Sequence, residues 1–167
     1  MTKIVFTASN TLLGKLIRWI TKSKVSHVFI EYHSSQWGGQ WALEAYITGV
    51  RKVPVSRVRH HVVAEFECLN IPSQAFLRIG KLVGEGYDFS GLFLFAWLHI
   101  IWKWFGKKMR KPLNATKGQF CSELGARFLD AAGVSDPRLD DPEKASPQIL
   151  FEVCSAFPEM FKKLPVR

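Results

Sequence analysis

A strand with apolar residues on both faces constrains this chain more than any other feature. Residues 24–32 have the sequence KVSHVFIEY, in which apolar side chains fall on both alternating faces. Such a strand needs cover on both sides, which predicts a central position in a sheet. By the two-residue period of a strand, His27 shares a face with Val25 and Phe29. Because an unpaired buried polar group is costly, His27 needs a partner, either as a structural histidine or as a functional one.

The remainder of the chain alternates short strands with helical segments. Apolar alternation predicts strands over residues 4–6, 41–47, 50–58 and 62–69, with Pro54 marking an edge or a bulge. Helical periodicity predicts a helix from Ser9 or Asn10 to about Thr21, and further helices over 72–83, 92–105 and 121–132. A last helix begins at Ser146-Pro147. We find no repeat and no long linker, so we expect a single domain over residues 1–167.

Bulk composition narrows the function classes. The 167 residues suffice for a hydrophobic core, and three cysteines without a CxxC motif predict neither a disulfide framework nor a cysteine-rich zinc site. We expect no metal and no cofactor. The N-terminus lacks the apolar core of a signal peptide, and no run approaches the roughly 18 apolar residues of a spanning helix. These features favour a cytoplasmic protein, and the net charge of +9 favours an anionic neighbour.

Cys121 stands at the predicted start of a helix. Leu124, Phe128 and Ala131 follow it at helical spacing, and Gly133 is a predicted stop. Unpaired N–H groups and the helix macrodipole stabilise a thiolate at such a position, and the thiolate is the nucleophilic form. The alternative is that Cys121 is a small buried apolar residue. Cys68 and Cys154 are predicted to be core residues.

Glu44 lies between apolar neighbours in the predicted strand 41–47, so it either faces water or has a partner. A cysteine, a histidine and a carboxylate together could act as nucleophile, general base and orienting group. The backbone N–H of Cys121 could face a developing oxyanion. Rivals are weaker. Glu31 is roughly 13 Å from His27 along the strand, and Glu123 points about 200° away from Cys121 round the helix. Other candidates are His33 and His99 as bases and Ser122 as nucleophile.

Five short segments add a resemblance to this chemical interpretation. They are 26–30 (SHVFI), 43–45 (LEA) with Gly49-Val50 just beyond, 87–89 (YDF), 120–124 (FCSEL) and 146–150 (SPQIL). In this order the chain resembles the circularly permuted papain-like hydrolases of the NlpC type, which include the YiiX-like proteins and are related to lecithin:retinol acyltransferase. The resemblance extends from about Ile4 to Phe157.

This resemblance implies an α+β fold in which helices pack on an antiparallel sheet and the nucleophile begins a helix. Cys121 then matches the nucleophile, His27 the base and Glu44 the third polar residue. Tyr87 and Asp88 match a segment that is structural or lines the substrate site. The implied activity is hydrolysis of a peptide or isopeptide amide, or of a lipid ester or thioester, through an acyl-enzyme.

The segment 92–117 is a basic, Trp-rich insertion that the resemblance does not cover. Its apolar part is interpreted as a buried helix or as an interfacial membrane segment, because aromatic side chains precede a basic cluster. The residues that would contact a membrane or anion are Trp102, Trp104, Lys107, Lys108, Arg110 and Lys111. A non-catalytic membrane- or partner-binding module on the same fold is the alternative function. We do not expect nucleic acid as the partner, because no base-stacking motif accompanies the charges.

Overall fold

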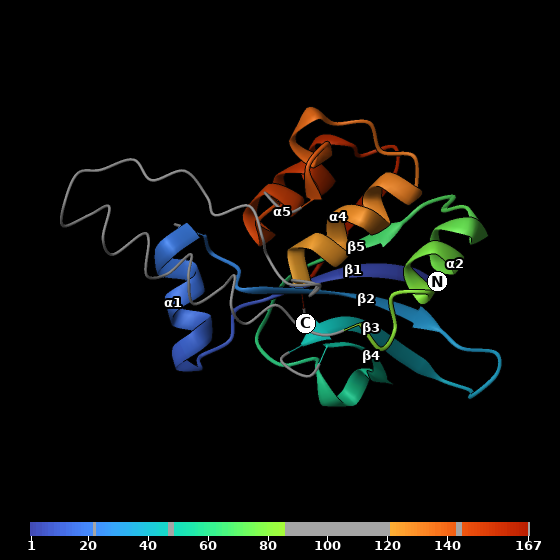
Figure 1. The fold of residues 1–167 in the computed structure, drawn as a ribbon, viewed down its shortest axis with the longest axis horizontal. Coiled ribbons are helices and arrows are strands. Elements are labelled where there is room, and N and C mark those ends of the chain that lie inside the picture. Colours follow the sequence, from blue (N-terminus) through green and yellow to red (C-terminus); the bar gives the residue numbers. More distant parts are fainter. Residues whose placement is uncertain (22, 47–48, 86–120, 143–144, 167) are drawn as a thin grey trace.

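A six-stranded antiparallel sheet forms the centre of the molecule (Figure 1). The computed structural model describes residues 1–21, 23–46, 49–85, 121–142 and 145–166. The strand order is β4-β3-β2-β1-β5-β6. The strands are β1 (Thr2–Thr7), β2 (His27–His33), β3 (Gln40–Tyr46), β4 (Gly49–Pro54), β5 (Val62–Cys68) and β6 (Phe161–Leu164).

Helices cover one face of this sheet. They are α2 (Ser73–Gly80), α4 (Cys121–Ala131) and α5 (Pro147–Ala156), all on the same side in Figure 1. Helix α1 (Leu12–Thr21) lies beyond one end of the sheet, and the short 3-10 helices are η1 (Val55–Arg57) and η2 (Pro137–Leu139). The predicted α+β class with an antiparallel sheet is confirmed. None of the helices in the described ranges is long and apolar enough to cross a membrane.

Strand β2 occupies the predicted central position, between β1 and β3. Val28 and Ile30 belong to the main core beneath the helices, whereas Phe29 belongs to a second cluster on the opposite face. The second cluster also contains Val5, Ala42, Val53 and Val55. Val25 lies in the main core and does not share Phe29's cluster, because the regular strand begins only at His27.

Other predicted boundaries moved for local reasons. Strand β4 ends at Pro54 and a 3-10 turn follows it, whereas the sequence predicted a strand to Val58; proline has no N–H to donate to a continuing ladder. Helix α2 ends at Gly80 instead of Val83. Strand β6, which pairs with β5, was not predicted.

Helix α4 packs closely enough to fix the position of its first residue. A Cβ atom added at Gly125 would lie 2.5 Å from Cδ1 of Leu150 in α5 and 3.5 Å from Cγ1 of Val28 in β2. Gly133 ends the helix with a φ of +89°, a conformation that favours glycine. The close approach of α4 to α5 therefore needs a residue without a side chain at position 125. Helix α4 also contacts β2 at Val28, which sets Cys121 beside the start of β2.

Candidate active site

Three elements bring the predicted residues together at one end of the sheet. His27 is the first residue of β2, Glu44 lies in β3 and Cys121 is the first residue of α4. Strands β2 and β3 pair with Ile30 opposite Leu43, so His27 and Glu44 lie near each other on one face. The Nε2 atom of His27 is 2.8 Å from Oε2 of Glu44.

Glu44 is a buried carboxylate with two cationic partners. Only 2% of its side chain is exposed. Its Oε1 atom accepts hydrogen bonds from both Nε (2.9 Å) and Nη2 (2.7 Å) of Arg51. Burial raises the pKa of Glu44, but the hydrogen bonds and charges of His27 and Arg51 lower it by more. The net result is a pKa below the usual value, so Glu44 is ionised.

The imidazole of His27 lies between a thiol and a carboxylate. Because Nε2 faces Glu44, Nδ1 is the nitrogen that remains for the Cys121 thiol, its other hydrogen-bond partner. Burial lowers the pKa of His27, but Cys121 and Glu44 raise it to about 10. The ring also lies beside Phe29, with centroids 6.4 Å apart.

The Cys121 thiol has the environment of a stabilised thiolate. Burial raises its pKa, but the charge of His27, the hydrogen bond from His27 and the backbone N–H groups of Val28 and Ser122 lower it to below the usual value. The position at the start of α4 adds the positive end of a helix dipole. Both shifts, the lowered pKa of Cys121 and the raised pKa of His27, favour the thiolate–imidazolium form of the pair.

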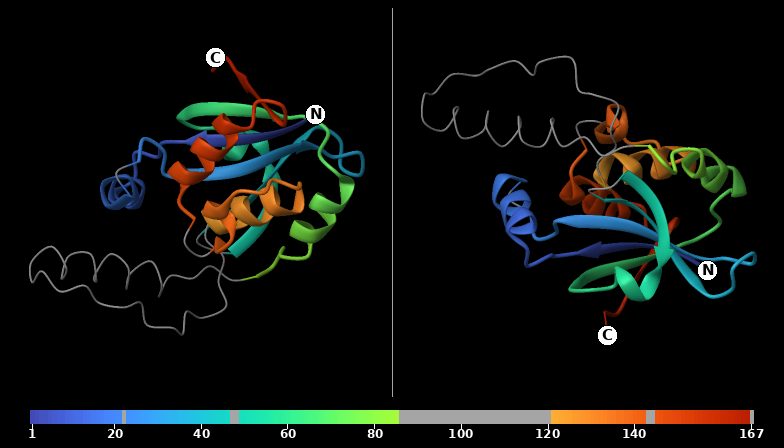
Figure 2. Two further views of the ribbon diagram at one scale, coloured as in Figure 1. Left: turned by 90° about the horizontal axis from the view of Figure 1, so that it is seen from above. Right: turned by 60° about the horizontal axis from the view of Figure 1, so that its bottom comes forward.

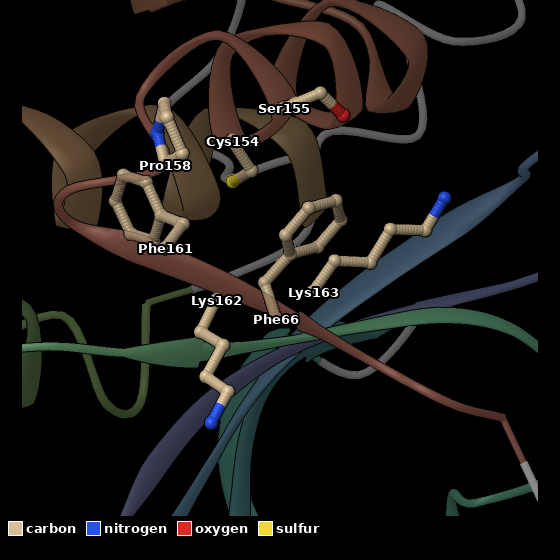
Figure 3. Close-up of a pocket in the computed structure, with 7 residues that line it drawn as sticks. All are labelled: Phe66, Cys154, Ser155, Pro158, Phe161, Lys162 and Lys163. Carbon is tan, nitrogen blue, oxygen red and sulfur yellow. The ribbon is translucent and has the colours of Figure 1, made fainter.

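The other two cysteines have the opposite environment. Burial raises the pKa of Cys68 to about 12, and burial also raises that of Cys154. Cys154 faces a pocket of about 360 Å³ next to α5 and β6 (Figure 3). The residues that line it are Phe66, Cys154, Ser155, Pro158, Phe161, Lys162 and Lys163. No histidine or carboxylate is among them, so this pocket offers Cys154 no partner of the kind that His27 gives Cys121.

The rival carboxylates have other partners. Glu31 accepts a hydrogen bond from Arg59 at 2.7 Å, and Glu123 accepts one from Arg127 at 2.9 Å. His33 is exposed at the far end of β2, and Ser122 is buried, with its backbone N–H directed at Cys121. Some candidates lie outside the described residues. They are Tyr87, Asp88, His99, Trp102, Trp104, Lys107, Lys108, Arg110 and Lys111, with the whole insertion 92–117.

Arg51 is a site residue that the sequence analysis missed. It lies directly opposite Glu44 in the β3–β4 pairing, and its guanidinium is 4.3 Å from the centroid of the Tyr46 ring. The strand register would have identified it. When Tyr46 pairs with Gly49, Arg51 lies opposite Glu44.

The assembled groups can act as nucleophile, proton-transfer group and orienting carboxylate. Within the part of the chain that the structure describes, no cluster of three or more histidine, cysteine or acidic residues could hold a metal ion. No protein-family model matches the chain, and no curated protein matches it. The site itself defines a class, a Cys-His-Glu constellation with a buried thiol and carboxylate, a half-buried imidazole and its cysteine at the first residue of a helix.

Proposed function

We propose that the protein is a cysteine hydrolase that uses Cys121, His27 and Glu44 to form and hydrolyse an acyl-enzyme. One observation carries the proposal: His27 contacts Cys121 and Glu44 together, and Glu44 is in turn held by Arg51. A structural histidine could bond any two polar groups, whereas the two partners of His27 are a thiol and a buried carboxylate. An imidazole between a helix-start thiol and a buried carboxylate is the arrangement that nucleophilic catalysis needs.

The chemistry follows from these positions. The Sγ thiolate of Cys121 attacks the carbonyl carbon of an amide, ester or thioester and forms a C–S bond. His27 gives its proton to the leaving amine, alcohol or thiol as the bond to the carbonyl breaks. The same imidazole then takes a proton from water, whose oxygen attacks the thioester and releases the acid and the thiolate. The backbone N–H of Cys121, the first residue of α4, is the group that would stabilise the oxyanion.

The fold class supports assignment to the permuted papain-like hydrolases of the NlpC type. Their expected order of catalytic residues, histidine before cysteine, is the order here, and helices on an antiparallel sheet fit the expected architecture. The substrates that this assignment implies are a peptide or isopeptide amide and a lipid ester or thioester.

Mass spectrometry of the intact full-length chain tests the proposal. We expect an activated acyl ester to add one acyl group to wild-type protein, and peptide mapping to place the group on Cys121. The variant Cys121→Ser should lose the adduct, whereas the matched control Cys154→Ser should keep it. An acyl group on Cys68 or Cys154, or none on any cysteine, contradicts the proposal. The second result would favour the non-catalytic binding module.

A further inference from the structure

Helix α1 exposes a face that combines apolar and basic side chains. Leu12 is 88% exposed and Trp19 is 51% exposed, and Lys15 between them is also exposed. Their spacing of three and four residues sets all three on one side of the helix. Arg18 borders this face, and exposed Lys24 follows the helix. We call Leu12, Lys15, Arg18, Trp19 and Lys24 the α1 face.

We propose that the α1 face docks the protein on an anionic membrane surface. Leucine and tryptophan side chains with neighbouring lysine and arginine are the composition of a helix that lies in the interface plane of a bilayer. Residues 1–30 contain no Asp or Glu, so no acidic group of this segment opposes attraction to anionic headgroups. A polyanion without an apolar interior would satisfy the basic residues but not Leu12 and Trp19.

The α1 face lies at the end of the sheet that carries the candidate active site. Helix α1 connects the end of β1 to the start of β2, where Thr7 pairs with His27. Both views in Figure 2 show α1 beyond this end of the strands. Two hydrogen bonds hold the chain before α1 against the chain after it. Ser9 donates its backbone N–H to Oγ of Ser26, and Ser26 donates its backbone N–H to the carbonyl of Thr7, each at 2.9 Å.

Docking through α1 therefore brings the Cys121 end of the molecule toward the bilayer. A second inference rests on the proposed hydrolase activity. Among the implied substrates, this geometry favours a lipid ester or thioester, because the acyl bond of a lipid lies at the same interface. The docking itself needs no thiolate. A Cys121→Ser variant should bind vesicles as wild-type protein does.

Vesicle co-sedimentation of the full-length chain tests the docking. We expect binding to phosphatidylcholine vesicles that contain about one-third phosphatidylserine, and little binding to pure phosphatidylcholine. Lys15→Ser with Lys24→Ser should lower the partition constant at least about tenfold, since each basic residue near such a surface contributes several-fold. Leu12→Gln with Trp19→Gln should lower it by a similar factor because the apolar contact is lost.

The matched control is Leu77→Gln with Lys81→Ser, which changes an exposed apolar residue in α2 and an exposed basic residue after it. It should bind as wild-type protein does. Equal binding of all variants overturns the proposal, as does equal binding to neutral vesicles. Binding to a short DNA duplex that the Leu12/Trp19 variant retains, with no binding to vesicles, assigns the face to nucleic acid instead. If the protein binds vesicles but forms no acyl-enzyme, the result supports the docking proposal and contradicts only the proposed hydrolase activity.

Discussion

Arg51 and Glu44 face each other across the β3–β4 pairing, and two nitrogens of Arg51 donate to the same carboxylate oxygen, Oε1. The other oxygen, Oε2, is left for His27. Without Arg51, the buried carboxylate of Glu44 would take up a proton more readily and would no longer stabilise a charged imidazole. The guanidinium lowers the pKa of Glu44 and fixes the direction of its free oxygen. Arg51 therefore positions His27 through Glu44, without itself contacting the reacting thiol.

Replacing Arg51 by Met tests this positioning role. We expect kcat/KM to fall about tenfold or more, mainly through kcat, because the imidazole loses its fixed orientation. The acid limb of the pH–rate profile should move to higher pH, since Glu44 without Arg51 takes up a proton more readily. Stopped assays across pH measure both effects. Arg51→Lys keeps the charge but not the paired hydrogen bonds and should be intermediate; an unchanged pH profile in Arg51→Met would contradict the role.

The parts of the site that the sequence predicted were those set by local pattern. His27 stood out because a polar residue in a strand covered on both faces needs a partner, and Cys121 because helical spacing begins at it. Glu44 was recognisable for the same reason as His27. Arg51 was missed because its importance depends on strand register, which a pattern of apolar residues alone does not supply.

The fold shows the same division. The central strand and the helix boundaries at Ser146 and Gly133 followed from apolar pattern and capping residues, and Ser146 does accept a hydrogen bond from the Ile149 backbone N–H. Strand β6 was missed because its four residues, FKKL, carry too little alternation to stand out. Its formation depends on the free edge of β5, a tertiary feature.

The alkaline limit of activity should lie near pH 10. His27 must carry a proton to protonate the leaving group, and its pKa is raised to about 10, so turnover is retained below that pH and lost as pH rises through it. Glu44→Gln removes a group that raises the pKa of His27. We therefore expect the alkaline limb to move to lower pH, with kcat/KM down at least about tenfold. A limb that stays in place would show that Glu44 does not control the imidazole.

Cys121 should be the reactive thiol at neutral pH. Its pKa is below the usual value, whereas those of Cys68 and Cys154 are raised, so Cys121 has the largest thiolate fraction of the three. Iodoacetamide should label Cys121 at least about a hundredfold faster than either of the others. Timed labelling followed by peptide mapping measures the three rates. His27→Ala should slow labelling of Cys121 alone, and equal rates for the three cysteines in the folded protein would refute the ion pair.

The contact between Gly125 and Leu150 should control the stability of α4. Gly125→Ala gains roughly 0.5–1 kcal/mol of helix propensity, but its methyl group meets the buried Leu150 at a distance no packed carbon tolerates. Overpacking costs about 1–3 kcal/mol, so we expect net destabilisation. Leu150→Ala alone should cost about 2–5 kcal/mol through the cavity it leaves. Urea unfolding of the double variant should show less than the summed loss, whereas strict additivity would mean that α4 shifts to accommodate the methyl group.

The charged network on the face of the sheet away from α2, α4 and α5 should be important for stability and not for turnover. Arg59 bridges Glu31 and Glu65, both nearly fully buried, and Lys3 lies 3.8 Å and 3.5 Å from the two carboxylates. In Arg59→Met, Lys3 is the one cation of the network that remains near the two buried carboxylates. Because this leaves buried negative charge poorly compensated, we expect the free energy of unfolding to fall by about 3 kcal/mol. The control Arg138→Met breaks the ion pair with Asp136 but leaves that carboxylate its hydrogen bond from the backbone N–H of residue 138, and it should cost less than about 1 kcal/mol. Because Glu31 is four residues from His27 and has no contact with it, kcat/KM of folded Arg59→Met should stay near the wild-type value. A large loss of activity without a loss of stability would mean that the network acts on the site through β2.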